Sequence, residues 1–299
     1  ATALLAPEHP RLWRSIFKNR YWLMTLPVVA SLLRDPKQQG SLLAAFSIGG
    51  GIRALRILLE NPVSVFCRPV RGIPADWFPR LMDLGSMTSG QSLMVGLLAA
   101  LACLHVARVR GRRTAGWWCM LVVLTAGMLL NLKRGSWLCT LLMVTVFLAW
   151  RKSWRGLALL ALAAVVFLTL PPVQERLRML CLESDPRAGG RLSMWTQVAP
   201  TLIREHPLGV GYGALTNEQI RRAASPSASR NIEDKQIHLH SNPIQVLVET
   251  GWPGLVLYLI WMTWALYAGI RAVRRGSTPS ERIYAAGLLV ILLGLLLNG

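Results

Sequence analysis

The sequence predicts an all-α membrane protein, a polytopic bundle of helices with one large loop outside the bilayer. Of its 299 residues, 53% are hydrophobic, and the mean hydropathy is +0.41. Apolar runs of about 15 to 20 residues recur along the chain, close to the length of helix that spans a bilayer. The runs mix Leu, Ala and Gly without the alternation of a strand, which argues against a membrane β-barrel.

The predicted membrane helices lie on either side of one long polar stretch. We expect membrane helices in residues 1–170, an outer loop with short helices in 171–242, and further membrane helices in 243–299. The clearest apolar runs are 90–107, 115–132, 136–150, 156–170, 252–270 and 283–299, with weaker ones at 21–33 and 41–59. The last run stops at the end of the sequence, so we expect the natural chain to continue.

The distribution of charge supports this topology. The net charge of +19 would suggest nucleic acid binding in a soluble protein, but most of the excess lies in short loops between apolar runs. Counting helices places three strongly basic loops on one side of the membrane: 108–114, 151–155 and 271–282. By the positive-inside rule this side is the cytoplasm, and residues 171–242 lie outside. We therefore expect a phospholipid membrane, and no nucleic acid, as a partner.

The N-terminus and the cysteines carry no clear functional signal. The N-terminus lacks the order of basic, apolar and small residues of a signal peptide, so we expect the membrane helices to direct targeting. Its basic residues would lie outside if 21–33 spans fully, so this segment is re-entrant or interfacial, or the chain lacks something there. The five cysteines have no metal-binding spacing. Three lie in apolar runs and are predicted to pack there, and a Cys67–Cys181 disulfide stays open.

One short loop on the outer side breaks the charge rule. Residues 132–136 connect two predicted helices in a tight turn, yet they include Lys133 and Arg134. Long cationic side chains often extend from helix ends to the membrane surface, which is the ordinary explanation. Because the rule disfavours cations on this side, we favour a functional role for Arg134.

A second arginine stands at the start of a predicted helix in the outer loop. Two glycines precede Arg191, and the helix is predicted to continue to about Arg204. The residues predicted on one face of this helix are Leu192, Trp195, Ala199 and Leu202. A helix N-terminus favours anions, and a guanidinium group can donate two parallel hydrogen bonds to a phosphate. The alternative is a surface helix with an exposed arginine.

The residues after this helix are predicted to form a turn and a polar segment. Residues 205–213 have the pattern of a helix stop and a glycine-rich turn, in which His206 is a capping or packing residue. The turn lacks the Gly-Lys-Ser/Thr ending of a nucleotide-binding loop. Residues 214–237 are polar and charged, and we expect them to be mobile until a substrate binds.

A cluster of polar residues then precedes an apolar run. His238 and His240 come first, and a short helix is predicted from Asn242 until the glycines and proline of 251–254 interrupt it. His240 therefore stands at the start of a helix that approaches the membrane. A lone histidine in such a place is more often structural, but the two arginines predicted on the outer side favour a functional role for this one.

Five short motifs now stand in order along the chain. They are Lys-Arg-Gly-Ser at 133–136, Gly-Arg-x-x-x-Trp at 190–195, His-Pro-x-Gly-x-Gly at 206–211, His-Ser-x-x-x-Gln at 240–245 and Glu-Thr-Gly-x-x-Gly at 249–254. Together they resemble the O-antigen ligase family, whose superfamily includes O-antigen polymerases and bacterial O-oligosaccharyltransferases. The resemblance covers about residues 85–299. Ser241 stands where asparagine is commoner in the family.

The resemblance implies a multi-pass glycosyltransferase of GT-C-like architecture in the bacterial inner membrane, with its active site on the periplasmic face. The donor would be an O-antigen on undecaprenyl pyrophosphate, and the acceptor a sugar of the lipid A core in lipopolysaccharide biosynthesis. Transfer would invert the anomeric carbon and need no metal or other cofactor. The resemblance implies catalytic roles for Arg134, Arg191 and His240. The substrate-binding residues that we predict are Arg134, Arg191, Lys133, Trp195, Gln245 and His238.

The chemistry of these residue types agrees with this assignment. A pyrophosphate leaving group gains negative charge as the glycosidic bond breaks, and fixed arginines stabilise that charge. The outer loop has no convincing acidic pair for a metal, because Glu183 and Asp185 have only the spacing. Imidazole exchanges protons near neutral pH, so His240 suits the role of a base for a sugar hydroxyl. We therefore predict that Arg134 and Arg191 lie close together on the outer face.

Three alternative functions stay open. An O-antigen polymerase would extend a second lipid-linked glycan, and a protein O-oligosaccharyltransferase would accept a serine of a pilin-like protein. A flippase for lipid-linked glycans is a non-enzyme alternative. Transporters place charges in the middle of their membrane helices, whereas the clearest apolar runs here carry none.

Overall fold

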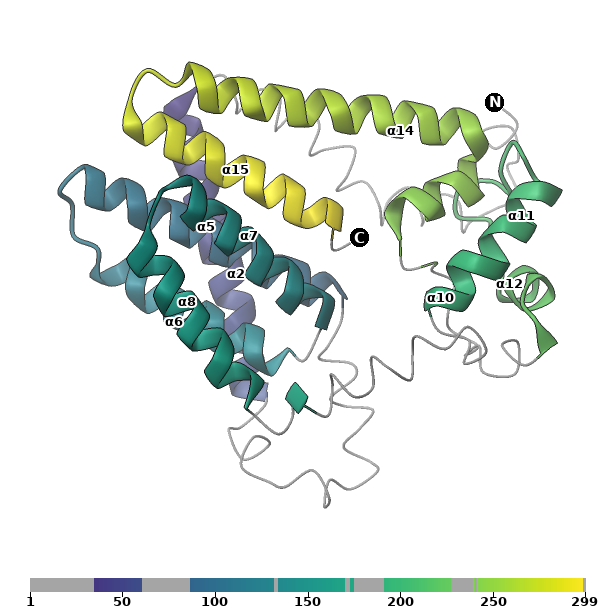
Figure 1. The fold of residues 1–299 in the computed structure, drawn as a ribbon, viewed down its shortest axis with the longest axis horizontal. Coiled ribbons are helices and arrows are strands. Elements are labelled where there is room, and N and C mark those ends of the chain that lie inside the picture. The colour runs from purple at the N-terminus through teal and green to yellow at the C-terminus, as the bar shows by residue number, and fades with distance from the viewer. Residues whose placement is uncertain are drawn as a thin grey trace. The chain divides into compact units, whose positions relative to one another are not determined.

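The chain folds into two compact helical units in this computed structural model (Figure 1). The loop unit comprises Ala1–Val29, Arg178–Ala265 and Gly299, and the bundle unit comprises Ala30–Leu177 and Leu266–Asn298. The structure describes residues 35–60, 87–131, 134–169, 173–174, 191–226, 239 and 241–297. Every regular element among these residues is a helix, which confirms the all-α prediction.

The bundle unit contains the apolar helices. They are α2 (Pro36–Glu60), α5 (Met87–Val109), α6 (Ala115–Leu130), α7 (Arg134–Trp150), α8 (Trp154–Leu168), α15 (Pro279–Leu297) and the C-terminal part of α14 (Asn242–Arg275). Within the described residues, α2, α5, α14 and α15 are long and apolar enough to cross a membrane. Helices α6, α7 and α8 are apolar but shorter. The chain is a polytopic helical membrane protein, as the sequence predicts.

The helix predictions agree with these bounds to within a few residues, apart from the C-terminal pair. The weak prediction at 41–59 is confirmed as α2, which begins five residues earlier at Pro36. The predicted segment 21–33 lies outside the described residues. The helix predicted at 252–270 is part of the longer α14, which already begins at Asn242. The loop between α14 and α15 is shorter than predicted, because α14 continues to Arg275 and α15 begins at Pro279.

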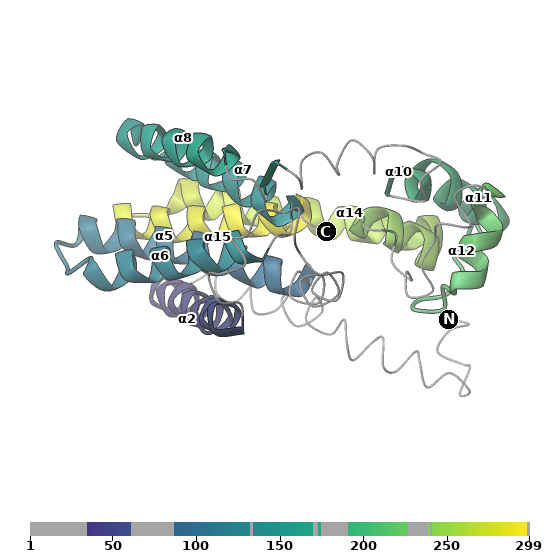
Figure 2. The ribbon, with the colours of Figure 1, turned by 90° about the horizontal axis from the view of Figure 1, so that it is seen from below.

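Helix α5 is the centre of the bundle unit. It is the most buried of the candidate membrane spans, since 72% of its apolar stretch is buried inside the protein. Figure 2 shows α2 on one side of α5 and α7 and α8 on the other. Helices α2 and α5 meet at Gly50 and Gly96, where a Cβ on Gly50 would lie 2.9 Å from the Cα of Gly96. Small residues at such a crossing let membrane helices pack closely, in the absence of a hydrophobic driving force between them.

The three basic loops lie at the same end of the bundle unit, as the charge pattern predicts (Figures 1 and 2). Arg110, after α5, donates a hydrogen bond from Nε to Oγ of Ser280 in α15 at 3.1 Å. Its guanidinium group also lies 5.7 Å from the ring centre of Tyr284. At the α7–α8 turn, Arg151 lies 5.8 Å from the ring centre of Trp150. The C-terminal end of α6 and the N-terminal end of α7, which begins at Arg134, are at the other end of the helices.

The prediction for the cysteines is confirmed in part. Cys103 is buried in the core around α5, and Cys139 is half-buried on α7. Cys119 is exposed on α6, so the prediction that it packs in a core is wrong. Its neighbours Trp117, Met120 and Leu121 do pack against the core. Cys67 and Cys181 lie outside the described residues.

The loop unit is built around one continuous helical segment. It begins as α10 (Arg191–Ser193), passes through the π-helical turn η4 (Met194–Val198), and continues as α11 (Ala199–Glu205). Its core contains Met194, Val198, Ala199, Leu202, Leu215, Ile220, Leu239 and Val248. The predicted helix from Arg191 to about Arg204 is therefore confirmed. His206 follows as its C-cap residue and donates its main-chain N–H to Leu202 O at 2.8 Å.

The predicted buried face of this helix is partly wrong. Ala199 and Leu202 are buried as predicted, but Met194 and Val198 occupy the core in place of Leu192 and Trp195. The π turn explains the change, because Ala199 donates to Met194 O, five residues back, and this extra residue rotates the preceding turn. Pro200 lacks an N–H for the carbonyl of Thr196 and its ring crowds that group, which favours the wider turn.

Helix α14 is broken at Gly251, where φ is 69° and ψ is −170°. Pro253 has no N–H, so the carbonyl of Glu249 has no partner within the helix. The loop before it supplies the missing donors. Val210 N–H donates to Val248 O at 3.0 Å, and Gly211 N–H donates to Glu249 O at 2.9 Å.

The same crossing brings two glycines into contact. Trp252 N–H, released by the break, donates to Pro207 O at 3.3 Å. A Cβ on Gly251 would lie 2.4 Å from the carbonyl carbon of Leu208, and a Cβ on Gly209 would lie 2.4 Å from Glu249 O. Both glycines have positive φ, 89° at Gly209 and 69° at Gly251. Only glycine suits either position, on conformational and on steric grounds.

Replacing Gly251 by alanine should therefore unfold the loop unit or distort its crossing. The positive φ alone costs about 1 to 2 kcal/mol, and the overlap with main-chain atoms adds to this. Thermal unfolding of the detergent-solubilised protein should show a lower Tm. Gly116→Ala is the matched control, because a Cβ there meets nothing within 4 Å. Equal Tm values for the two variants would contradict this account of the crossing.

Candidate active site

The best-defined polar arrangement in the loop unit surrounds the main chain of Leu239. The indole Nε1–H of Trp195 donates to Leu239 O at 2.7 Å. The N–H of Leu239 donates to Oε1 of Gln245 at 2.9 Å. The Leu239 side chain is fully buried, at 0% exposure, in the core of the loop unit. Leu239 is thus held by its side chain and by both of its main-chain polar groups.

Glu249 orients the amide of Gln245. The two residues stand one turn apart on α14, and Nε2 of Gln245 donates to Oε1 of Glu249. A carboxylate accepts hydrogen bonds and an amide nitrogen only donates, so this contact directs Oε1 of Gln245 towards Leu239. Glu249 is itself 9% exposed. A buried carboxylate is costly to desolvate, and donors close to it offset that cost.

The four outer-loop motifs therefore meet in one place. Trp195 ends the first, and Gly211 ends the second and binds the carbonyl of Glu249. Gln245 ends the third motif, and Glu249 begins the fourth. Residues that are separated by up to 54 positions in the chain, from Trp195 to Glu249, are joined through Leu239 and Gln245. The histidine motif is consequently attached to the core through its last residue, Gln245, and through Leu239, which directly precedes it.

The predicted site residues fall in both units. Arg191 is the first residue of α10 in the loop unit, and Arg134 is the first residue of α7 in the bundle unit. The main chains of both residues are described. Arg191 begins a helix as predicted, whereas Arg134, which was predicted in the turn before a helix at 136–150, is already the first residue of α7. Their proximity stays a prediction. Lys133, His238 and His240 lie outside the described residues.

Two predicted substrate-binding residues are brought together by the structure. Trp195 and Gln245 both contact Leu239, the residue between His238 and His240. The indole N–H and the amide oxygen make these contacts within the protein. Binding of substrate by either residue stays a prediction. Sequence reasoning missed Leu239 and Glu249, although a glutamate four residues after Gln245 on a predicted helix was a usable signal.

A further residue that the sequence did not single out lies at the end of α6. Asn131 is 0% exposed, and both polar atoms of its side chain lack hydrogen-bond partners in the described part of the chain. A Cβ on Gly90 would lie 2.9 Å from Nδ2 of Asn131, so α5 packs closely here. An unsatisfied buried amide costs about 1 to 3 kcal/mol. Asn131 directly follows α6 and stands three positions before Arg134, the first residue of α7.

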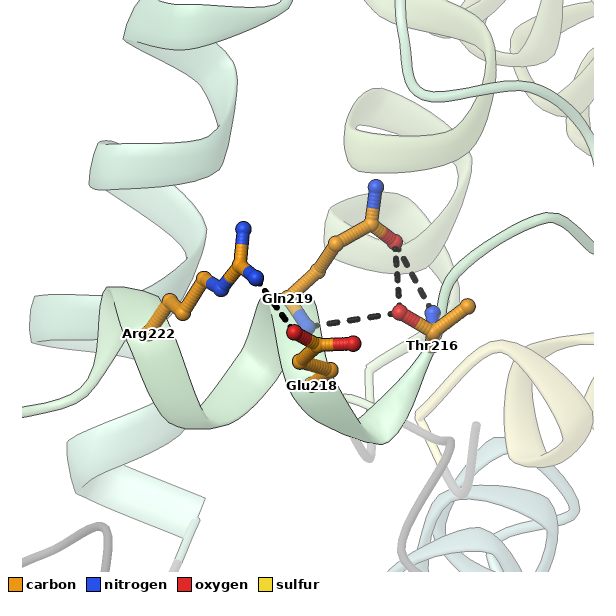
Figure 3. A network of polar contacts seen from close by, with 4 residues as sticks. All are labelled: Thr216, Glu218, Gln219 and Arg222. Carbon is orange, nitrogen blue, oxygen red and sulfur yellow. Dashed lines mark hydrogen bonds and ion pairs between the residues drawn. The ribbon is translucent and has the colours of Figure 1, made fainter.

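Helix α12 (Asn217–Ala223) covers part of the loop-unit core. Thr216 and Gln219 form a capping box, in which Gln219 N–H donates to Oγ1 of Thr216 and Thr216 N–H donates to Oε1 of Gln219 (Figure 3). Glu218 and Arg222 form an exposed ion pair one turn apart. Part of the polar segment 214–237 thus forms a helix that the sequence analysis did not predict, and its mobility stays a prediction. The Thr-x-x-Gln spacing was the missed signal, and Ile220 anchors the helix.

Metal-binding groups of at least three His, Cys, Asp or Glu side chains do not occur in the parts of the chain that the structure describes. Glu183 and Asp185 lie outside these residues. The polar groups around Leu239 are an indole, an amide and one carboxylate, a set better suited to holding main chain than to binding a cation.

Comparison with known proteins now bears on the site. A family model described as O-Antigen ligase matches residues 119–259. The resemblance to the O-antigen ligase family is confirmed. The match covers just under half of the chain and includes the α6–α7 turn and all four motifs of the loop unit. No curated protein and no solved structure matches the chain.

The O-antigen ligase match also bears on activity. It supports a function of the O-antigen ligase or polymerase type, and therefore a glycosyltransferase-like enzyme. Together with the apolar helices, it indicates a membrane setting and a lipid-linked glycan. The contacts around Leu239 lie inside the matched region.

Thr216→Ala should loosen α12. Loss of the N-cap hydroxyl leaves helix N–H groups unpaired and costs about 1 kcal/mol. Hydrogen exchange of the α12 amides should become faster. Arg222→Ala is the control, because it removes only an exposed ion pair, and such pairs contribute little. Equal acceleration of exchange in both variants would show that the capping box has no special role.

Proposed function

We propose that the protein is an O-antigen ligase of GT-C-like architecture in the bacterial inner membrane. It transfers a polysaccharide from undecaprenyl pyrophosphate to a sugar of the lipid A core, at the periplasmic face. The observation that carries this proposal is the family match over residues 119–259, which contains every residue to which we assign a role. The contacts among the loop-unit motifs support it, because they gather those motifs around Leu239, the residue between His238 and His240 in the sequence.

The arginines bind the donor in this proposal. Arg134 and Arg191 hold the pyrophosphate, each at the first residue of a helix, where free N–H groups and the helix dipole also favour an anion. Lys133 adds positive charge beside Arg134. As the bond to the sugar breaks, its electron pair stays on the pyrophosphate oxygen, and the cations stabilise the growing charge.

His240 activates the acceptor. It takes the proton from a hydroxyl of the core sugar while that oxygen attacks the anomeric carbon. A new carbon–oxygen bond forms to the acceptor as the bond to pyrophosphate breaks on the opposite side, so the configuration inverts. The proton resides on His240 and the electron pair on the leaving group. His238 contacts the acceptor or the loop close to it.

The acceptor distinguishes this proposal from its relatives. A polymerase would use a second lipid-linked glycan, and a protein O-oligosaccharyltransferase would use a serine of a pilin-like protein. The test is transfer by purified protein in detergent, with the same donor and each of the three acceptors in turn. Transfer to the lipid A core supports the ligase. Transfer to one of the other acceptors alone would replace it, and a flippase would give no product with any.

His240→Ala should separate chemistry from donor binding. Loss of a general base typically lowers the rate by about 10² to 10⁴. Affinity for the undecaprenyl-pyrophosphate glycan should stay close to normal. The measurement is single-turnover transfer by folded protein at saturating donor, beside a binding assay. A near-normal rate would remove His240 from the mechanism.

Arg191→Ala provides the contrasting variant. It should weaken donor binding and slow turnover together, because phosphate contacts exist in the ground state and strengthen as charge develops. Arg191→Lys should recover little, since lysine lacks the planar pair of donors. Donor affinity that is unchanged in Arg191→Ala would contradict its assignment to the pyrophosphate.

Transfer should need no divalent cation. The reason is the proposed use of arginines for the charge that a metal would otherwise stabilise. Protein treated with a chelator and then dialysed should keep its activity. Activity that disappears on chelation and returns specifically with magnesium or manganese would show that the arginines are not sufficient.

A further inference from the structure

We infer that Trp195, Gln245 and Glu249 are positioning residues. They hold residues 238–240, the histidine segment, by the main chain of Leu239. This inference rests on the proposed function, because it assigns these residues to the orientation of His240. It differs from the expectation that Trp195 and Gln245 bind substrate. The contacts that carry it lie within the loop unit and within the described residues.

The first step is the geometry of the peptide groups. Leu239 O belongs to the peptide group that joins Leu239 to His240, and Leu239 N–H belongs to the group that joins His238 to Leu239. Each peptide group is planar, so a partner on one of its polar atoms restricts the orientation of the whole group. Trp195 holds the first group at 2.7 Å and Gln245 holds the second at 2.9 Å. The main chain of Leu239 is therefore restrained on both sides.

The second step is the rigidity of the partners. Trp195 lies in the π turn that Pro200 favours, and its neighbour Met194 is buried at 0% exposure. Gln245 lies on α14, and its N–H donates to Ser241 O at 2.8 Å within the first turn. The Leu239 side chain adds a third anchor in the same core. A segment anchored in this way presents the following residue in few orientations, as catalysis requires.

The third step concerns the carboxylate. Gln245 supports Leu239 only when its oxygen faces the Leu239 N–H, because the opposite orientation would place two donors against each other. The hydrogen bond from Gln245 Nε2 to Glu249 selects the correct orientation. Gly211 N–H fixes the main chain of Glu249 at 2.9 Å. The break in α14 is thus connected to the histidine segment through Glu249 and Gln245.

Trp195→Phe and Gln245→Leu test the inference. Phenylalanine keeps an aromatic ring but removes the donor to Leu239 O, and leucine removes the acceptor for Leu239 N–H. Each variant should lower kcat by about 10- to 100-fold, since a misplaced catalytic group costs rate at this scale. The affinity for the undecaprenyl-pyrophosphate glycan should not change. Trp264→Phe, at an exposed tryptophan of α14, is the matched control and should transfer normally.

Glu249 provides a rescue experiment. Glu249→Gln keeps an oxygen that accepts from Gln245, so it should retain most of the kcat. Glu249→Leu should behave like Gln245→Leu, because the amide is then free to turn. This difference between the two substitutions is not expected of a residue that only fills space. Rates are taken on the folded fraction after size-exclusion chromatography, in single turnover at saturating donor.

The outcomes test the inference and the proposed function separately. Wild-type kcat in folded Trp195→Phe and Gln245→Leu would overturn the inference. A loss of donor affinity with a normal rate at saturation would also overturn it, and would show that these residues bind substrate. If His240→Ala is inactive in either case, the proposed function stands without the inference. A normal rate in His240→Ala would instead remove the proposed function.

Discussion

Main-chain hydrogen bonding at the break in α14 determines how the loop unit is assembled. Pro253 has no N–H to give to Glu249 O, and Gly251 departs from helical geometry. Val210 and Gly211 supply the donors from another segment. The loop can approach only because Gly209 and Gly251 have no side chains at the contact. An interruption that would be costly in an isolated helix therefore joins two motifs far apart in the sequence.

The polar contacts of the candidate active site extend from this break. Gly211 holds the main chain of Glu249, Glu249 orients Gln245, and Gln245 accepts from Leu239. Trp195 holds the other side of Leu239 from a separate helix. The proposed base thus follows a residue that is anchored on three sides. Leu239 needs no charged side chain for this role, because a hydrogen bond to a planar peptide group restricts the orientation of the whole group.

The bundle unit obeys different physical rules. Its interior depends on close packing of small residues, as at Gly50 and Gly96, since lipid and protein are equally apolar. Its basic loops lie together at one end, where Arg110 reaches Ser280 of α15. The other end carries Arg134 and the buried amide of Asn131, which has no hydrogen-bond partner within the described residues. Gln39 and Arg151 of the same unit also have a buried side-chain atom without a hydrogen-bond partner among the described residues.

The sequence by itself determined the membrane helices, the grouping of the basic loops and the resemblance to the O-antigen ligase family. Helix length and the charge of short loops are local properties, so α5, α6 and α7 were predicted to within a few residues. The helix at Arg191 was predicted too, but its buried face was not, because the π turn before Pro200 changes the register. Only the tertiary structure decided that Trp195 and Gln245 hold Leu239 and that Gly209 crosses Gly251. The contacts of Trp195 with Leu239 and of Gly209 with Gly251 join residues tens of positions apart, and no local periodicity or propensity encodes which of them meet.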